Sequence, residues 1–300
     1  MPHRPLIHMF VLLLYLQAIP AMAQMTPTNI RWLIFDFPPI YVVSGPLQGQ
    51  GFVDHMEQDI KQRLPQYQHS RSTTNIKRVL ETIKAQQQVC ASGLLWTENQ
   101  AQYITYSLPF MFVLPAKFVI RAEDLPRFQP YLDPNGALSL RQLLNQTDLI
   151  LGYTHARAYS KTLAPIIEHD TNPTNSLASN RDSVTKPLIN MLNHKRFDYT
   201  IAFPSEVRFL AQELSIAPET FLTIPILESN WAQHAYVGCP KTPWGEQVIA
   251  RVNQEIKKLR TQPGFMEHYL YWLDQPSKQQ YNRLVAQGFH DTFPPKPPHP

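Results

Sequence analysis

Two successive series of short strand-like and helix-like segments run along the chain and restrict the folds that it can adopt. The first series opens with the apolar run 30–35, which is followed by a helical stripe in which Phe52, Met56, Ile60 and Leu64 stand four residues apart. The pattern restarts after residue 138. Alternating strands and helices of these lengths predict an α/β fold with mostly parallel sheets, and two series predict two lobes.

The individual elements follow from apolar periodicity and from the positions of Pro and Gly. Strands are expected over residues 30–35, 67–73, 89–95, 110–120, 149–153, 175–178, 198–203, 221–227 and 235–239. Helices are expected over residues 52–64, 76–87, 138–144, 158–169, 184–193, 204–214, 245–261, 265–273 and 277–287.

The N-terminus has the three parts of a secretory signal peptide. Arg4 supplies a positive charge, residues 6–16 form an apolar run, and Ala21-Met22-Ala23 is a small-x-small cleavage pattern. The run is shorter than the roughly 20 residues that cross a bilayer. We therefore expect residues 1–23 to be removed after Ala23, which places the mature protein in the periplasm without membrane insertion.

Charge and motifs exclude several function classes. The formal charge is +4 and no block of Lys or Arg occurs, so the sequence does not indicate nucleic-acid binding. No spacing typical of a serine hydrolase, a zinc protease or a phosphate-binding loop is present, and no cofactor or metal is expected. The Pro-rich tail, residues 289–300, is expected to be disordered.

The chain contains two cysteines, Cys90 and Cys239. An even number of cysteines in an exported protein permits a disulfide. Two buried free thiols are the alternative, and the residues alone leave both open.

Four short stretches, taken in order, resemble bacterial extracellular solute-binding protein family 3, the amino-acid-binding branch of periplasmic receptors. They are closest to a proteobacterial subgroup of that family. The stretches are Phe37-Pro38-Pro39-Ile40 with Gly51-Phe52, Thr97-Glu98 with Ser107-Leu108-Pro109-Phe110, residues 149–153, and residues 196–203.

The resemblance implies a two-lobed fold of the periplasmic binding protein type 2 class, with two mixed sheets joined by a two-strand hinge. Lobe one would comprise residues 24–118 and 235–288, and lobe two residues 119–234. On this topology both cysteines lie on strands of lobe one, which implies a Cys90–Cys239 disulfide.

The resemblance also implies that the ligand-binding residues lie at the carboxyl ends of the strands, where open α/β sheets bind ligands. Any single one of these residues could instead be an ordinary core or surface residue. The candidates are Phe37, Tyr41, Trp96, Gln100, Tyr106 and Phe110 in lobe one, and Tyr153, His155, Arg157, Tyr159, Ser205 and Glu206 in lobe two.

The sequence departs from the family's amino-acid clamp at two positions. Gln100 stands where the family usually places the Arg that grips the ligand carboxylate. Ser205, followed by Glu206, stands where the family places an acid for the ligand ammonium. Arg157, just before the helix expected from Ala158, could supply an anion site, with a solvent-exposed Arg as the alternative.

These observations predict a monomeric solute-binding protein without catalytic activity, which captures a small molecule. A ligand with an aromatic ring and an anionic group would suit the candidate residues, and an ABC-transporter permease is the candidate partner. Two alternatives remain. One is a periplasmic enzyme of the same fold, of the dehydratase kind, for which Glu206 and His155 are the candidate acid–base residues. The other is a ligand-sensing or docking partner of a membrane receptor.

Overall fold

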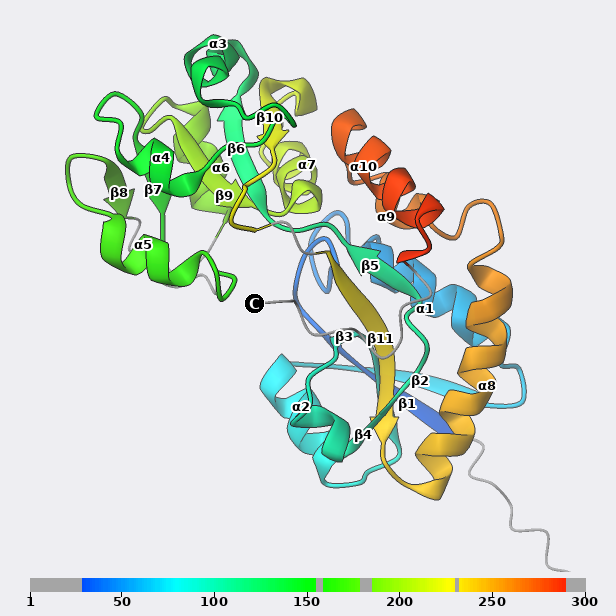
Figure 1. Cartoon of the computed structure of the whole chain (residues 1–300). Coiled ribbons are helices and arrows are strands. Elements are labelled where there is room, and N and C mark those ends of the chain that lie inside the picture. Colours follow the sequence, from blue (N-terminus) through cyan, green and yellow to red (C-terminus); the bar gives the residue numbers. More distant parts are fainter. Residues whose placement is uncertain (1–28, 155–158, 179–184, 230–231, 290–300) are drawn as a thin grey trace, which may run out of the picture.

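The computed structural model describes residues 29–154, 159–178, 185–229 and 232–289. They form two α/β lobes, each built around its own sheet (Figure 1). The expected signal peptide lies outside the described residues, as does the expected tail except for Phe289. Among the helices of the described ranges, none combines the length and the apolar composition needed to cross a membrane.

The sheet of lobe one has the strand order β2-β1-β3-β11-β4, and β5 also pairs with β11. β1 is parallel to β2 and β3, whereas β11 is antiparallel to β3, β4 and β5. The strands are β1 (Asn29–Phe35), β2 (Gln68–Thr74), β3 (Val89–Leu95), β4 (Ile104–Tyr106), β5 (Met111–Val113) and β11 (Gln233–Pro240).

The helices of lobe one bury the apolar stripes that the sequence predicts. Phe52, Met56 and Ile60 of the first helix are all at most 1% exposed, which confirms the stripe of four-residue spacing. These helices are α1 (Phe52–Gln62), α2 (Ile76–Lys84), α8 (Pro243–Leu259) and the short 3-10 helix η1 (Gln100–Gln102).

The sheet of lobe two has the order β10-β6-β9-β7-β8. Its strands are β6 (Lys117–Arg121), β7 (Leu151–Tyr153), β8 (Ser176–Ala178), β9 (Tyr199–Ala202) and β10 (Phe221–Ile224). The apolar residues of α3 (Leu125–Phe128), α4 (Leu140–Leu144) and α5 (Ala164–Asp170) belong to one core cluster. Those of α6 (Lys186–Asn193) and α7 (Pro204–Glu213) belong to a second cluster, which is continuous with the core of lobe one.

Lobe two also contains short 3-10 helices beside these elements. They are η2 (Ala122–Asp124), η3 (Gln129–Tyr131) and η4 (Pro218–Thr220).

Two expected elements differ from the structure. The apolar segment 110–120 is not one strand, because Pro115 has no N–H for a ladder and separates β5 from β6, which belong to different sheets. The helix expected from Ala158 begins only at Ala164, where Pro165 occupies the first turn. β4 and α3, which are short, were not predicted.

The direction of the strands decides which strand ends face the boundary between the lobes. The chain passes from lobe one to lobe two between β5 and β6, and returns between β10 and β11. β6 therefore points away from lobe one, and β9 and β7 run opposite to it. β11 likewise points away from lobe two, and β3 and β1 run opposite to β11. The carboxyl ends of β1, β3, β7 and β9 thus face the other lobe.

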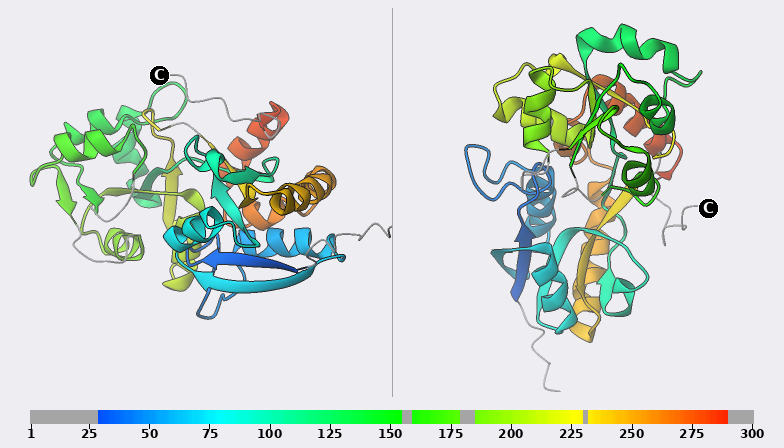
Figure 2. Two further views of the ribbon diagram at one scale, coloured as in Figure 1. Left: turned by 90° about the horizontal axis from the view of Figure 1, so that it is seen from below. Right: turned by 90° about the vertical axis from the view of Figure 1, so that its left-hand side faces the viewer.

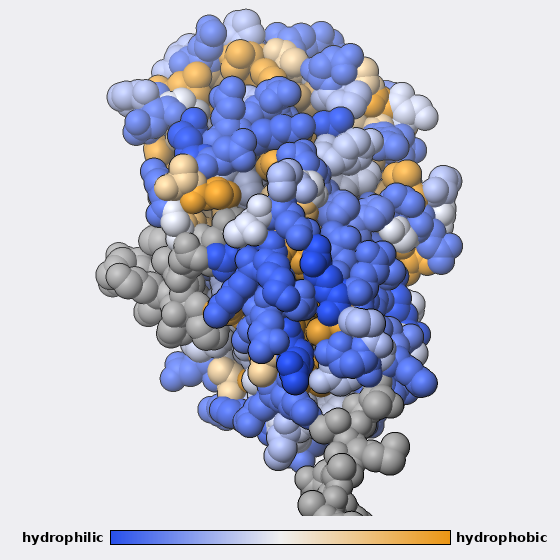
Figure 3. All heavy atoms as spheres, turned by 90° about the vertical axis from the view of Figure 1, so that its right-hand side faces the viewer, coloured by the Kyte–Doolittle hydropathy of each residue, from blue (hydrophilic) through white to orange (hydrophobic). Residues whose placement is uncertain are grey.

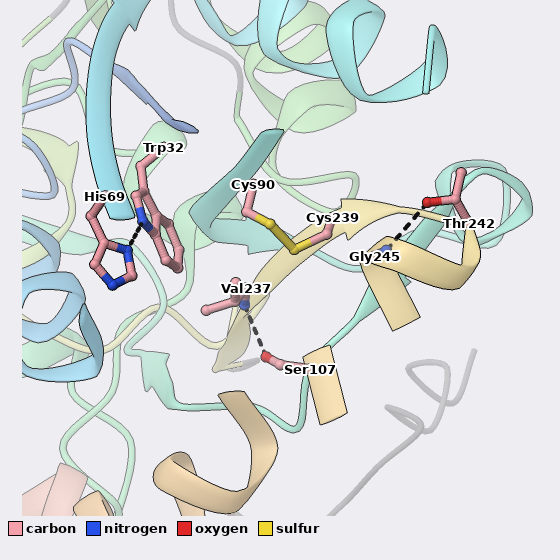
Figure 4. The surroundings of a disulfide bond; sticks show 8 residues. All are labelled: Trp32, His69, Cys90, Ser107, Val237, Cys239, Thr242 and Gly245. Carbon is pink, nitrogen blue, oxygen red and sulfur yellow. Dashed lines mark hydrogen bonds between the residues drawn. A yellow bond between two sulfur atoms is a disulfide. The ribbon is translucent and has the colours of Figure 1, made fainter. Parts of the chain in front are cut away.

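A disulfide joins Cys90 of β3 to Cys239 of β11, as the resemblance implied (Figure 4). The two residues are 149 positions apart in sequence, and their Cα atoms are 4.3 Å apart. Close by, the amide of Val237, which is also in β11, donates to the Ser107 hydroxyl at 2.9 Å (Figure 4). This hydrogen bond fastens the segment between β4 and β5 to β11. The returning strand is therefore fastened to the part of lobe one that the chain builds first.

The C-terminal helices α9 (Glu267–Leu270) and α10 (Gln275–Ala286) lie beside both lobes (Figures 1 and 2). On the side of lobe one, the Tyr281 ring stacks on Phe112 at 4.1 Å. On the side of lobe two, Trp272 meets Phe209 of α7 edge-on at 5.5 Å. On the face seen in Figure 3, apolar residues form small separate patches among hydrophilic ones.

Candidate functional site

The carboxyl ends of β1, β3, β7 and β9 face the boundary between the lobes, and we call these ends, with the described residues that follow them, the strand-end region. On the side of lobe one it contains two large apolar side chains that remain open to solvent. Phe37, after β1, and Leu95, at the end of β3, are each 43% exposed. Trp96 follows Leu95 and is half-buried against the core of lobe one. Apolar surface of this kind suits the lining of a small-molecule site.

Two of the predicted lobe-one residues lie in the core instead. Tyr41 and Phe110 are both 0% exposed. The Tyr41 hydroxyl donates to Glu57 Oε2 at 2.6 Å, and burial together with Glu57 raises the pKa of Tyr41. Neither side chain reaches solvent, so neither can line the strand-end region.

A buried ionic cluster surrounds Tyr41. Glu57 is fully buried and accepts from Lys61 Nζ at 2.9 Å, while Arg71 Nε lies 3.2 Å away. Asp54 accepts from the backbone amides of Val42 and Gly51. The cluster therefore fastens the loop after β1 to the first turns of α1.

Gly51 is required where this loop meets α1. A Cβ atom at this position would lie 2.4 Å from the carbonyl oxygen of Ile40. This close approach gives a physical reason for the Gly-Phe pair at the start of the first helix.

Gln100 and Tyr106 lie together at the far end of the loop after β3. The Tyr106 hydroxyl donates to Gln100 Oε1 at 2.9 Å and also approaches the Leu95 carbonyl at 3.2 Å. Tyr106 is 9% exposed, and burial raises its pKa. The Gln100 amide oxygen is thus already engaged, which leaves its NH₂ group as the donor that could meet a ligand.

Lobe two brings Tyr153 and Tyr159 to the strand-end region. Tyr153 ends β7 and is 8% exposed. The Thr154 amide donates to the Tyr159 hydroxyl at 3.3 Å, which folds the Tyr159 side chain back towards the end of β7. Two other predicted residues, His155 and Arg157, lie outside the described residues.

The later start of α5 affects the predicted anion site. Arg157 was expected just before a helix that starts at Ala158, but α5 starts at Ala164 and has only 7 residues. The proposed contribution of exposed helix amides beside Arg157 therefore has no support from α5.

Ser205 and Glu206 lie in the first turn of α7, directly after β9. They are 5% and 7% exposed. Glu206 Oε2 accepts from the Phe203 amide at 2.9 Å, and the Thr185 hydroxyl lies 3.4 Å from Oε1. This carboxylate caps its own helix and is already hydrogen-bonded within lobe two.

Sequence reasoning missed Leu95 and a cavity of about 590 Å³ that contains none of the predicted residues. Leu95 could have been found as the last residue of a buried strand, beside Trp96. Within the described ranges, no group of three or more His, Cys, Asp or Glu side chains is placed to hold a metal ion.

Comparison with solved structures identifies the fold. The second substrate-binding domain of Lactococcus lactis GlnP, in its open conformation, superposes with a TM-score of 0.60 at 12% identity and covers 82% of this chain and 95% of that domain. The probable amino-acid ABC transporter extracellular-binding protein YtmK of Bacillus subtilis gives 0.60 at 14% identity, with 83% and 98% covered. The second substrate-binding domain of a putative amino-acid ABC transporter from Streptococcus pneumoniae gives 0.58 at 12% identity, with 82% and 100% covered.

The protein has the two-lobed α/β fold of the type 2 periplasmic binding proteins, with two mixed sheets. No protein-family model matches the sequence, and no curated protein matches it either. At these identities the likeness establishes the fold alone.

Proposed function

We propose that this chain is an exported solute-binding protein of the family 3 kind, which captures a small molecule between its two lobes. One observation carries the proposal: the carboxyl ends of β1 and β3 face those of β7 and β9 across the lobe boundary. In open α/β sheets, ligands bind at such strand ends. Hinged closure of two lobes around a ligand is the known motion of periplasmic binding proteins.

The side chains at this region favour a ligand with an apolar or aromatic part. Phe37 and Leu95 are exposed, and Trp96, which follows Leu95 in the chain, is half-buried. Rings of this kind bind flat apolar groups by stacking and by area burial. Glu206 is engaged in capping and Gln100 carries no charge, so a free α-amino acid is not the preferred ligand.

The remaining parts of the proposal concern the cellular setting. Residues 1–23 act as the export signal, and the mature protein acts in the periplasm. Lobe one comprises 24–118 with 235–288, and lobe two 119–234. Two of the structural neighbours are described as binding proteins or domains of amino-acid ABC transporters and the third as a substrate-binding domain, which supports a permease as the partner.

A thermal-shift screen of residues 24–300 tests the proposal. The panel contains amino acids, aromatic acids, polyamines, sugars and phosphates. A ligand present at a hundredfold excess over its Kd stabilises the folded state by about 2.7 kcal/mol, which raises the melting temperature measurably. Recovery of the ligand unchanged supports a solute receptor.

Two other results would redirect the interpretation. If a stabilising compound is consumed, the chain is an enzyme of this fold. If no class of compound shifts the melting temperature, the solute-binding proposal fails, and a docking role at a membrane receptor becomes the better explanation.

A further inference from the structure

A second candidate site lies away from the strand-end region, in a cavity of about 590 Å³. One wall comes from lobe one, through Leu47 in the loop before α1 and through Tyr271 and Trp272 after α9. The facing wall includes Gln212, near the end of α7 in lobe two. The volume lies within the range of about 300–1,000 Å³ that small-molecule sites occupy.

The apolar part of this cavity is aromatic. Trp272 is 3% exposed and meets the Tyr271 ring edge-on at 4.9 Å. Tyr271 itself is 51% exposed, although it is a large ring on a folded segment. The open part of this wall is therefore the Tyr271 ring, which offers apolar area to the body of a ligand.

The polar part of the cavity is formed by two stacked histidines. The rings of His55, in α1, and His268, in α9, lie 4.9 Å apart at an angle of 12°. His55 Nε2 is 3.2 Å from Gln50 Oε1, and His268 Nε2 is 3.1 Å from Asp59 Oδ2. Burial, together with His268, lowers the pKa of His55 and favours its neutral form.

Glu267 gives the lining its charge. It is exposed in the cavity wall, and among the described residues no Lys, Arg or His forms an ion pair with it. The described residues that line the cavity include no Lys or Arg. Arg208, which lies over the Tyr271 ring at 4.9 Å and approaches the Leu273 carbonyl, is the cation that faces this wall from α7.

We propose that this cavity is a second binding site, which takes a small organic cation with an aromatic or apolar body. The ammonium group pairs with Glu267, and the body packs against Tyr271 and Leu47. This inference does not depend on the ligand of the strand-end region.

The test compares three probes of the same shape and different charge: phenethylamine, 2-phenylethanol and phenylacetate. Binding to residues 24–300 is measured by titration calorimetry at neutral pH and at two salt concentrations. We expect phenethylamine to bind most tightly and phenylacetate most weakly, with salt weakening only the amine.

Two variants locate the amine. Glu267→Gln should weaken phenethylamine binding about fivefold, as expected for an exposed charge pair, and leave 2-phenylethanol unchanged. Glu81→Gln, an exposed carboxylate on α2, is the matched control. Gln212→Trp fills the cavity from lobe two and should abolish binding of all three probes, with circular dichroism confirming that the variant is folded.

The inference is overturned if phenylacetate binds more tightly than phenethylamine, because Arg208 would then set the charge preference. It is also overturned if Glu267→Gln and Glu81→Gln behave alike, or if phenethylamine does not bind. Loss of binding in Trp96→Ala, with Glu267→Gln unchanged, would place the amine in the strand-end region and would equally contradict it.

Discussion

At the scale of single residues, burial separates side chains that support the site from those that can meet a ligand. Tyr41 and Trp96 are both aromatic and both follow a strand of lobe one, so the sequence makes them equivalent. The structure makes them different, because Tyr41 is 0% exposed and bonded to Glu57, whereas Trp96 remains half-exposed. A pattern of residue types predicts which loops face the site, but packing decides which members of each loop reach it.

Tyr41→Phe should therefore reduce stability. The substitution removes a 2.6 Å hydrogen bond to a buried carboxylate, which is worth about 1.5–3 kcal/mol. Urea denaturation measures the loss. Tyr67→Phe is the control, because Tyr67 is half-buried and has no side-chain hydrogen bond within the described part of the chain. Equal stability of the two variants would show that the Tyr41–Glu57 bond contributes nothing.

Gly152→Ala should also destabilise the protein, for a steric reason. Gly152 lies in β7, and a Cβ atom there would be 2.2 Å from the ring of Phe197, which is 2% exposed. Overpacking of this kind costs about 1–3 kcal/mol. Phe197→Leu should recover part of the loss in the double variant, as a coupled pair requires. Additive effects in thermal denaturation would contradict the steric account.

At the scale of elements, the returning strand β11 and the helix α10 hold the two passages of the chain together. β11 pairs with β3, β4 and β5, and a disulfide fastens it to β3. α10 lies at the first passage, where Lys117 Nζ donates to Ser277 Oγ at 2.8 Å. The sequence predicted both elements. It did not predict that Pro115 divides the segment 110–120, because an apolar run looks the same whether it forms one strand or two.

Breaking the disulfide should lower the free energy of unfolding and leave the fold unchanged. A bridge that closes a loop of 149 residues is worth about 2–5 kcal/mol. We expect the double variant Cys90→Ala/Cys239→Ala to unfold at lower urea than the oxidised protein. Dithiothreitol should lower the midpoint of the wild type and leave that of the double variant unchanged. If dithiothreitol leaves the urea midpoint of the wild type unchanged, the result contradicts a Cys90–Cys239 bridge.

Lys117 should make stability depend on pH in the alkaline range. Burial lowers its pKa from 10.5 to about 8, with Asp274 acting in the opposite direction. Between about pH 8 and 10.5 the unfolded chain binds the proton more strongly, so the wild type gains stability with rising pH. The gain is roughly 3 kcal/mol at most.

The check is urea denaturation between pH 7 and 10.5. Lys117→Met should lack the rise, and Lys278→Met, a substitution on α10 next to Ser277, should retain it. Below about pH 8 the difference between Lys117→Met and the wild type should be constant. A wild-type profile that runs parallel to that of Lys117→Met at alkaline pH would show that Lys117 keeps an ordinary pKa.

At the scale of the whole molecule, the sequence predicts the fold more completely than it predicts the details of the site. Alternating elements in two series predict two α/β lobes, and the fold of the solved structures agrees. The loops after β1 and β3 were also predicted. The sequence analysis missed three features: the engagement of Glu206 in capping, the start of α5 at Ala164, and the cavity between α9 and α7. Glu206, three residues after Phe203, and Pro165 are themselves sequence signals of a helix start. The cavity depends on contacts between residues far apart in the chain, which a sequence pattern does not specify.

The central claim is that the protein binds a solute at the strand-end region. Titration calorimetry on variants with substitutions in this region tests it most directly. The compound with the largest thermal shift is titrated into the wild type, Phe37→Ala, Trp96→Ala and the control Glu81→Ala. We predict that each aromatic variant weakens binding about tenfold, because each removes a ring contact worth about 0.5–1.5 kcal/mol together with its buried area. Undiminished affinity in both Phe37→Ala and Trp96→Ala would contradict the claim.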